Sequence, residues 1–178
     1  METFDRSLNC FFILVLISVA AAAQNSGFRK YDVNGDKIVD RQEFNTRYAD
    51  NYKEWDRNVD QNVDKDEFYG TNFDHADRDN NGKLSSDEWY AAYDNMYKDK
   101  LAKRDFGTYD TNQDGSISVF EFTDAFQGTN YYSSYDSNKD GKVDQEELNE
   151  NVFKDWDDNN DGKLERDEYE RHGSYSQS

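Results

Sequence analysis

A twelve-residue acidic pattern recurs four times in the chain, over residues 77–88, 110–121, 136–147 and 157–168. Each copy has Asp at position 1, Asp or Asn at positions 3 and 5, Gly at position 6 and Glu at position 12. Like charges held this close repel one another. A solvated acidic surface would not keep the Gly and the closing Glu in phase. The pattern therefore indicates that a cation belongs inside each copy.

The residue types suit calcium. Ca²⁺ takes about six to eight oxygen ligands, so short side chains at positions 1, 3 and 5 must converge from a tight turn. Gly permits the turn, position 7 offers its backbone carbonyl, and Glu at position 12 binds with both oxygens. We predict the ligands to be Asp77, Asp79, Asn81, Lys83, Glu88, Asp110, Asn112, Asp114, Ser116, Glu121, Asp136, Asn138, Asp140, Lys142, Glu147, Asp157, Asn159, Asp161, Lys163 and Glu168.

These four stretches resemble the calcium-binding loops of the EF-hand superfamily, whose motif is D-x-[DN]-x-[DN]-G-x5-E. The resemblance implies an all-α protein built from helix–loop–helix repeats. Position 8 is apolar in every copy, and the resemblance implies that loops pair there through a short β-bridge. These residues are Leu84, Ile117, Val143 and Leu164.

Two further copies, residues 32–43 and 56–67, lack Gly at position 6, which is Lys37 in one and Gln61 in the other. A side chain forced to positive φ there costs about 1 kcal/mol. An Asp at position 9 of each copy offers extra ligand charge. We expect weaker Ca²⁺ binding than in the other four, giving up to six sites; the alternative is that these two loops keep the fold without metal. Their candidate ligands are Asp32, Asn34, Asp36, Glu43, Asp56, Asn58, Asp60 and Glu67.

The six copies, numbered loops 1 to 6 in chain order, are spaced as an internal duplication. Corresponding loops of the two sets lie 78 or 80 residues apart. We predict two similar three-hand units, 24–97 and 98–172, joined by a helical connector over 89–109 and followed by a flexible tail, 173–178. Only nine residues separate loops 2 and 3, and loops 5 and 6, so one helix must serve both loops. The spacing does not decide whether odd loops pair with odd ones or loops pair between the units.

The core is expected to be aromatic. Residues 24–178 contain thirteen Val, Ile and Leu against twenty-five Phe, Tyr and Trp. Aromatic residues flank nearly every loop at helical spacing, which indicates a buried helix face; an aromatic ligand pocket is the alternative. Low aliphatic content with a net charge of −18 is typical of disorder, unless bound cations compensate.

The N-terminal segment has the features of a secretory signal peptide. Residues 10–23 form an uncharged apolar run that ends in small residues. We expect cleavage before Gln24, which removes residues 1–23 with Cys10 and changes the net charge from −18 to −17. The alternative is an uncleaved anchor or a buried helix. The rest of the chain has no apolar run that could span a membrane.

The sequence favours a secreted calcium-binding protein without catalytic activity. It has no nucleophile–base pair, its acidity argues against nucleic acid, and its two histidines, His75 and His172, are expected at the surface. Its role would be structural, in calcium storage or in the extracellular matrix or mineral. One alternative is a calcium sensor, although residues 24–178 hold one Met, Met96, where sensor grooves are Met-rich. The other is a lumenal calcium buffer like the six-hand reticulocalbins, which usually carry a C-terminal retrieval signal that is absent here.

Overall fold

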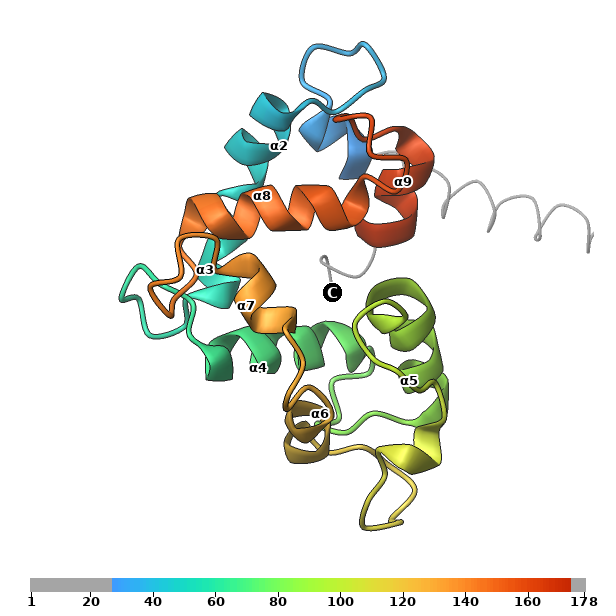
Figure 1. Ribbon diagram of the computed structural model, residues 1–178. Helices are drawn as coiled ribbons and strands as arrows, with labels where there is room; N and C mark the ends of the chain where they lie inside the picture. Colours follow the sequence, from blue (N-terminus) through green and yellow to red (C-terminus); the bar gives the residue numbers. More distant parts are fainter. Residues whose placement is uncertain (1–26, 174–178) are drawn as a thin grey trace, which may run out of the picture.

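The computed structural model describes residues 27–173, which form an all-α protein (Figure 1). The predicted signal peptide, 1–23, lies outside these residues, as does the predicted tail beyond Gly173. None of the described helices is long and apolar enough to cross a membrane. Residues 27–31 are helical, and the other elements are α2 (Arg41–Tyr48), α3 (Tyr52–Trp55), α4 (Lys65–Ala76), α5 (Ser86–Ala92), the π-helical η1 (Tyr93–Tyr97), the 3-10 turn η2 (Phe106–Thr108), α6 (Val119–Ala125), α7 (Tyr131–Tyr135), α8 (Gln145–Trp156) and α9 (Arg166–His172).

Each loop starts the helix that follows it. The residue at position 9 is the N-cap, and the Glu at position 12 is the third residue of the helix. In loops 1 to 5 the cap side chain accepts the backbone N–H of this Glu, whose carboxylate accepts the N–H of the cap. This reciprocal arrangement satisfies two backbone donors at the start of the helix. The closing Glu therefore has a structural role besides its candidate role as a ligand.

Antiparallel β-bridges pair the loops in a nested order. Val39 pairs with Leu164, Val63 with Val143, and Leu84 with Ile117, all at position 8. Loop 1 thus lies beside loop 6, loop 2 beside loop 5, and loop 3 beside loop 4. Both backbone bonds of each bridge measure 2.8–3.2 Å from nitrogen to oxygen. The predicted pairing of loops at position 8 is confirmed. Of the two pairings that the sequence left open, the structure has the second, because every bridge joins a loop before residue 98 to a loop after it. The division into two units stays a prediction.

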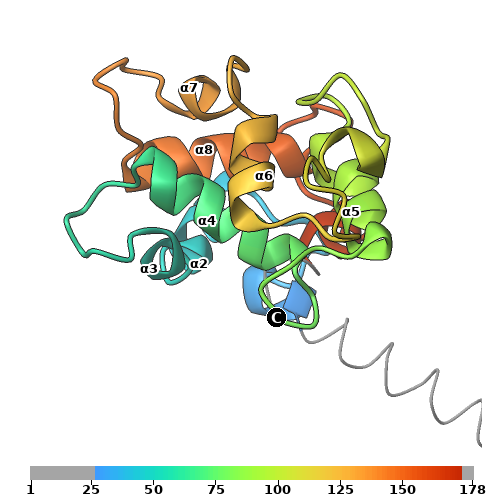
Figure 2. The same cartoon turned by 90° about the horizontal axis from the view of Figure 1, so that it is seen from below.

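Two long helices connect the loop pairs to one another. α4 runs from loop 2 to loop 3, and α8 runs from loop 5 to loop 6, each with 12 residues. One helix thus serves two loops, as the short spacings predicted, and places them about 18 Å apart. α2 packs on α8, and α6 packs on α4 (Figures 1 and 2). Bridges and shared helices together link all six loops in the order 1, 6, 5, 2, 3, 4.

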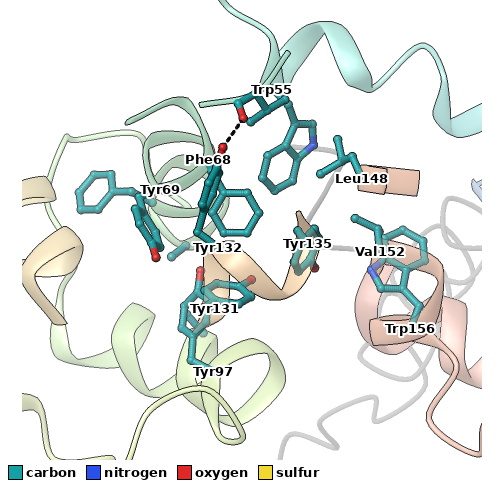
Figure 3. Packing of buried hydrophobic residues seen from close by; sticks show 14 of the residues in the cluster. Trp55, Phe68, Tyr69, Tyr97, Tyr131, Tyr132, Tyr135, Leu148, Val152 and Trp156 are labelled. Carbon is teal, nitrogen blue, oxygen red and sulfur yellow. Dashed lines mark hydrogen bonds between the residues drawn. The ribbon is translucent and has the colours of Figure 1, made fainter. Parts of the chain in front are cut away.

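The core is aromatic, as predicted. The residues immediately before and after each loop are all buried, and they come from every part of the described chain. Phe68 on α4 is fully buried and has Trp55, Tyr131, Tyr132 and Tyr135 around it, with ring centroids 5.0–5.5 Å from its own (Figure 3). Edge-to-face pairs at such distances add about 0.5–1.5 kcal/mol beyond the area that they bury.

The predicted helical connector is correct only in its first part. The chain stays helical through η1, but residues 101–105 have no helical structure. In this segment two backbone carbonyls accept hydrogen bonds from aromatic side chains instead of from helical backbone N–H groups. The Trp89 Nε1–H donates to the Arg104 carbonyl at 3.0 Å, and the Tyr93 hydroxyl donates to the Leu101 carbonyl at 3.0 Å. The Arg104 guanidinium also binds both oxygens of Asp94, at 2.5 and 2.6 Å.

The two histidines are partly buried, so their expected place at the surface was wrong. The His75 ring packs edge-on against Trp55, with centroids 5.6 Å apart, and the His172 side chain is 11% exposed. Burial lowers the pKa of each imidazole to about 4. The sequence did not indicate this, because each histidine lies in the last turn of its helix and its burial depends on contacts with segments distant in the chain.

Candidate metal centres

The Asp at position 1 organises the turn of every loop. One of its carboxylate oxygens accepts the backbone N–H of position 6, at 2.7–3.1 Å in all six loops. The side chain at position 3 accepts the N–H of position 5, at 2.8–3.1 Å. These bonds direct the oxygens of positions 1, 3 and 5 toward the interior of a tight turn. The predicted ligands at positions 1, 3 and 5 therefore share the same turn geometry in all six loops.

The Glu at position 12 folds back over its own loop. Its Oε1 accepts the N–H of position 3, at 2.9–3.3 Å, and its Oε2 accepts the N–H of position 9, at 2.8–3.2 Å. The same set of bonds occurs in loops 1 and 2, although they lack Gly at position 6. The carboxylate therefore stays close to the residues with which it would share an ion.

Burial of carboxylates follows the loop pattern closely. Ten acidic residues are buried among residues 27–173, and all of them stand at position 1 or 12 of loops 2 to 6: Asp56, Glu67, Asp77, Glu88, Asp110, Glu121, Asp136, Glu147, Asp157 and Glu168. Loop 1 differs, because Asp32 and Glu43 are only partly buried. No Lys or Arg of the described chain is buried to the same degree. Backbone N–H groups solvate these carboxylates, but the two acids of each loop still repel each other, and a cation between them would offset that repulsion.

The donor set fits a calcium ion. In loop 3, ligand oxygens of Asp77, Asp79 and Glu88 all lie within 4.8 Å of one another. Hard oxygen donors at this spacing suit Ca²⁺ rather than a transition metal, which prefers nitrogen or sulfur. An ion held there would supply the positive charge that the buried carboxylates lack. The backbone at position 7 is also fixed, since its N–H donates to the side chain of position 5, at 2.9–3.0 Å in loops 3 to 6.

The closing carboxylates differ in acidity. Burial acts to raise the pKa of Glu121, but bonds from Ser118, Asn112 and Thr111 outweigh it and lower that pKa to about 2. In Glu88 the same balance also lowers the pKa, with Ser85 as the main donor. Glu168 is the opposite case, because burial and the neighbouring Glu165 raise its pKa.

Loops 3 and 4 are joined by a side chain as well as by their bridge. Lys83, at position 7 of loop 3, reaches Asp114 Oδ2 at 3.3 Å and Ser116 Oγ at 3.1 Å in loop 4. Lys83 is a candidate ligand through its carbonyl, while its ammonium contacts a candidate ligand of the neighbouring loop. The sequence could not show this contact, because it did not define which loops are paired.

Position 6 is left-handed in all six loops. Lys37 has φ of 73° and Gln61 has φ of 70°, beside the four Gly residues at 80–89°. This confirms the strain predicted for loops 1 and 2. Position 4 is left-handed as well, with φ of 54–76°, which the sequence motif does not specify; the Gly or Asn at this position in three loops is the available signal. Val59 in loop 2, with φ of 61°, is the unusual residue, because β-branched side chains avoid this region.

Replacing Val59 by Asn should stabilise the protein by about 1 kcal/mol, because Asn tolerates positive φ. The side chain is 80% exposed, so little packing is lost. Urea unfolding of the calcium-loaded protein measures the change. Val33→Asn is the matched control: Val33 is 60% exposed but does not have positive φ, so its effect should stay within about 0.5 kcal/mol. Equal effects of the two substitutions would show that loop 2 is not strained.

The chain matches the EF hand family over residues 73–91, 104–126, 133–154 and 148–171. These segments contain loops 3 to 6 in full. No curated protein and no solved structure matches the chain. The four matches support an EF-hand calcium-binding family, in agreement with the helical fold and the loop geometry described above.

Proposed function

We propose that this protein of EF-hand repeats is a secreted, multi-site calcium-binding protein whose ions hold its fold together. The burial of carboxylates carries the proposal. All ten buried acidic residues of the described chain stand at the two ends of a candidate calcium loop, without a buried cationic side chain to balance them. Ions in the loops would balance this charge, and the bridges and shared helices would then join the filled loops into one body.

A structural or storage role agrees better with this arrangement than a sensor does. A calcium sensor opens a Met-rich apolar groove when it is loaded. Here Met96 is packed against the aromatic core, and the residues that flank the loops are already buried in it. Extracellular EF-hand modules bind Ca²⁺ with a Kd of about 10⁻⁴–10⁻³ M, so they stay largely filled outside cells. We propose the same for this chain, as a structural element, a calcium store or a matrix component.

Titration with calcium tests the structural role against sensing. Far-UV circular dichroism should gain helix, while the fluorescence of the apolar dye ANS should fall as the core closes. A rise in ANS fluorescence in the loaded state would support the sensor instead. Calorimetry should give six ions, with the last and weakest in loop 1, because Asp32 and Glu43 are the least buried end residues. The substitution Glu43→Gln should remove that weakest step and lower the affinity of loop 6, because Val39 of loop 1 is bridged to Leu164 of loop 6.

Secretion is tested separately. The protein should appear in the medium of cells that express the full chain, and N-terminal sequencing should find a start within two residues of Gln24. A product that keeps residues 1–23, or that stays with the cells, would contradict the proposed location and leave the calcium-binding part of the proposal to be judged by the titration.

A further inference from the structure

Lys83 places a positive charge at the candidate calcium site of the neighbouring loop. It stands at position 7 of loop 3, next to Leu84, which is bridged to Ile117 of loop 4. The bridge brings Lys83 beside loop 4, where its Nζ lies 3.3 Å from Asp114 Oδ2 and 3.1 Å from Ser116 Oγ. The lysine of one loop therefore contacts a candidate ligand of the other.

The two oxygens of Asp114 have different partners. Oδ1 accepts the backbone N–H of Ser116 at 3.0 Å and the hydroxyl of the same residue at 2.6 Å. Oδ2 has the Lys83 ammonium and, at 3.4 Å, the side-chain amide of Asn112. Because the bonds from Ser116 occupy Oδ1, Oδ2 is the oxygen that this carboxylate can offer to an ion. Lys83 contacts this same oxygen.

Loops 5 and 6 also have a lysine at position 7, but without this contact. The ammonium groups of Lys142 and Lys163 make no hydrogen bond or ion pair with any described residue. The carboxylates at position 5 of these loops, Asp140 and Asp161, accept the N–H of position 7 through Oδ1, and no described donor bonds to their Oδ2. Within the described chain, only Lys83 of these three lysines reaches the loop that is paired with its own.

An ammonium and a calcium ion at one carboxylate oxygen repel each other. The contact is half-exposed, with 55% of the Lys83 side chain and 42% of the Asp114 side chain accessible, so solvent and salt moderate the effect. We propose that Lys83 competes with Ca²⁺ for Asp114 and lowers the affinity of loop 4 for its ion. This rests on the proposed function, since it concerns an ion in one of the same loops. Loop 4 then fills at a higher calcium concentration than its own ligands require.

The amide signal of Gly115 reports the filling of loop 4. Its N–H donates to Asp110 Oδ2 at 3.0 Å, so an ion on that carboxylate changes its position in the ¹H–¹⁵N spectrum. Gly141 makes the same bond to Asp136, at 2.9 Å, and reports loop 5. In a calcium titration, Lys83→Met should move the Gly115 midpoint to about fivefold lower calcium, and the Gly141 midpoint by less than about twofold.

A charge series at position 83 separates repulsion from packing. Lys83→Arg keeps the charge and should keep the Gly115 midpoint within about twofold, whereas Lys83→Glu should lower it about fivefold further than Lys83→Met. In about 1 M KCl, where the Debye length is about 3 Å, the effect of Lys83→Met should fall below about twofold. Lys142→Met is the matched control: it makes the same change at position 7 of loop 5 and should leave the Gly115 and Gly141 midpoints within about twofold.

Three results would overturn the competition. They are an unchanged Gly115 midpoint in Lys83→Met, an equal shift of Gly141 in Lys142→Met, and an effect of Lys83→Met that persists at high salt. Each would leave calcium binding by loop 4 intact. A Gly115 signal that ignored calcium in the unsubstituted protein and in the variant would reject both the competition and the proposed function of loop 4, so the two failures are distinguishable.

Discussion

Removal of calcium should unfold the protein. With EDTA, the radius of gyration should rise from about 15 Å toward about 40 Å, the values for compact and unfolded chains of about 150 residues. The reason is electrostatic: the chain carries a net charge of −18, and ten of its carboxylates are buried in the candidate loops. Without ions this repulsion has nothing to oppose it except an aromatic core, and no disulfide is available because the chain has a single Cys.

Small-angle X-ray scattering and far-UV circular dichroism measure this effect together. Addition of excess Ca²⁺ to the chelated sample should restore both signals, whereas Mg²⁺, which demands a smaller octahedral site, should restore them poorly. If the chelated protein kept the helicity and the radius of the loaded form, the coupling of folding to calcium would be wrong.

The substitution Glu147→Gln should remove the ion of loop 5 and weaken loop 2 as well. Glu147 is buried, closes loop 5 and is the third residue of α8. Loop 5 is bridged to loop 2 through Val143 and Val63, so a disordered loop 5 deprives loop 2 of its partner. We expect calorimetry to count two fewer ions at millimolar calcium, together with a lower unfolding temperature.

Glu146→Gln is the matched control for this experiment. It makes the same change of charge one residue away on the same helix, but Glu146 is exposed. It should leave the ion count unchanged and alter the free energy of unfolding by less than about 0.5 kcal/mol. An unchanged ion count for Glu147→Gln would reject its assignment as a ligand. Loss of one ion alone would show that paired loops fill independently.

The candidate sites could be predicted from the sequence, because their geometry is local. A loop of twelve residues that must converge on one ion restricts the residue type at nearly every position, so candidate ligands in loops 3 to 6 could be named one by one. The shared helices α4 and α8 followed from segment length alone. Even the strain at Lys37 and Gln61 could be expected from the missing Gly.

The pairing of the loops could not be predicted, because it depends on distant contacts. All six bridging residues are aliphatic, so any two of them could form the same bridge. They are Val39, Val63, Leu84, Ile117, Val143 and Leu164. The choice is made by aromatic packing between segments far apart in the chain. The end of the connector helix at η1 and the burial of the histidines depend on the same packing, which explains why they were also missed.

The nested order of the bridges determines when each hand can be completed as the chain is made. Leu84 and Ile117 are about 30 residues apart in sequence, whereas Val39 and Leu164 are about 125 apart. The innermost pair can close early, but the hand synthesised first must wait for the one synthesised last. At about 5–20 residues per second, this delay lasts many seconds. A chain that ended before Leu164 would leave loop 1 without its bridging partner. Completion of the outermost bridge therefore depends on synthesis of nearly the whole chain.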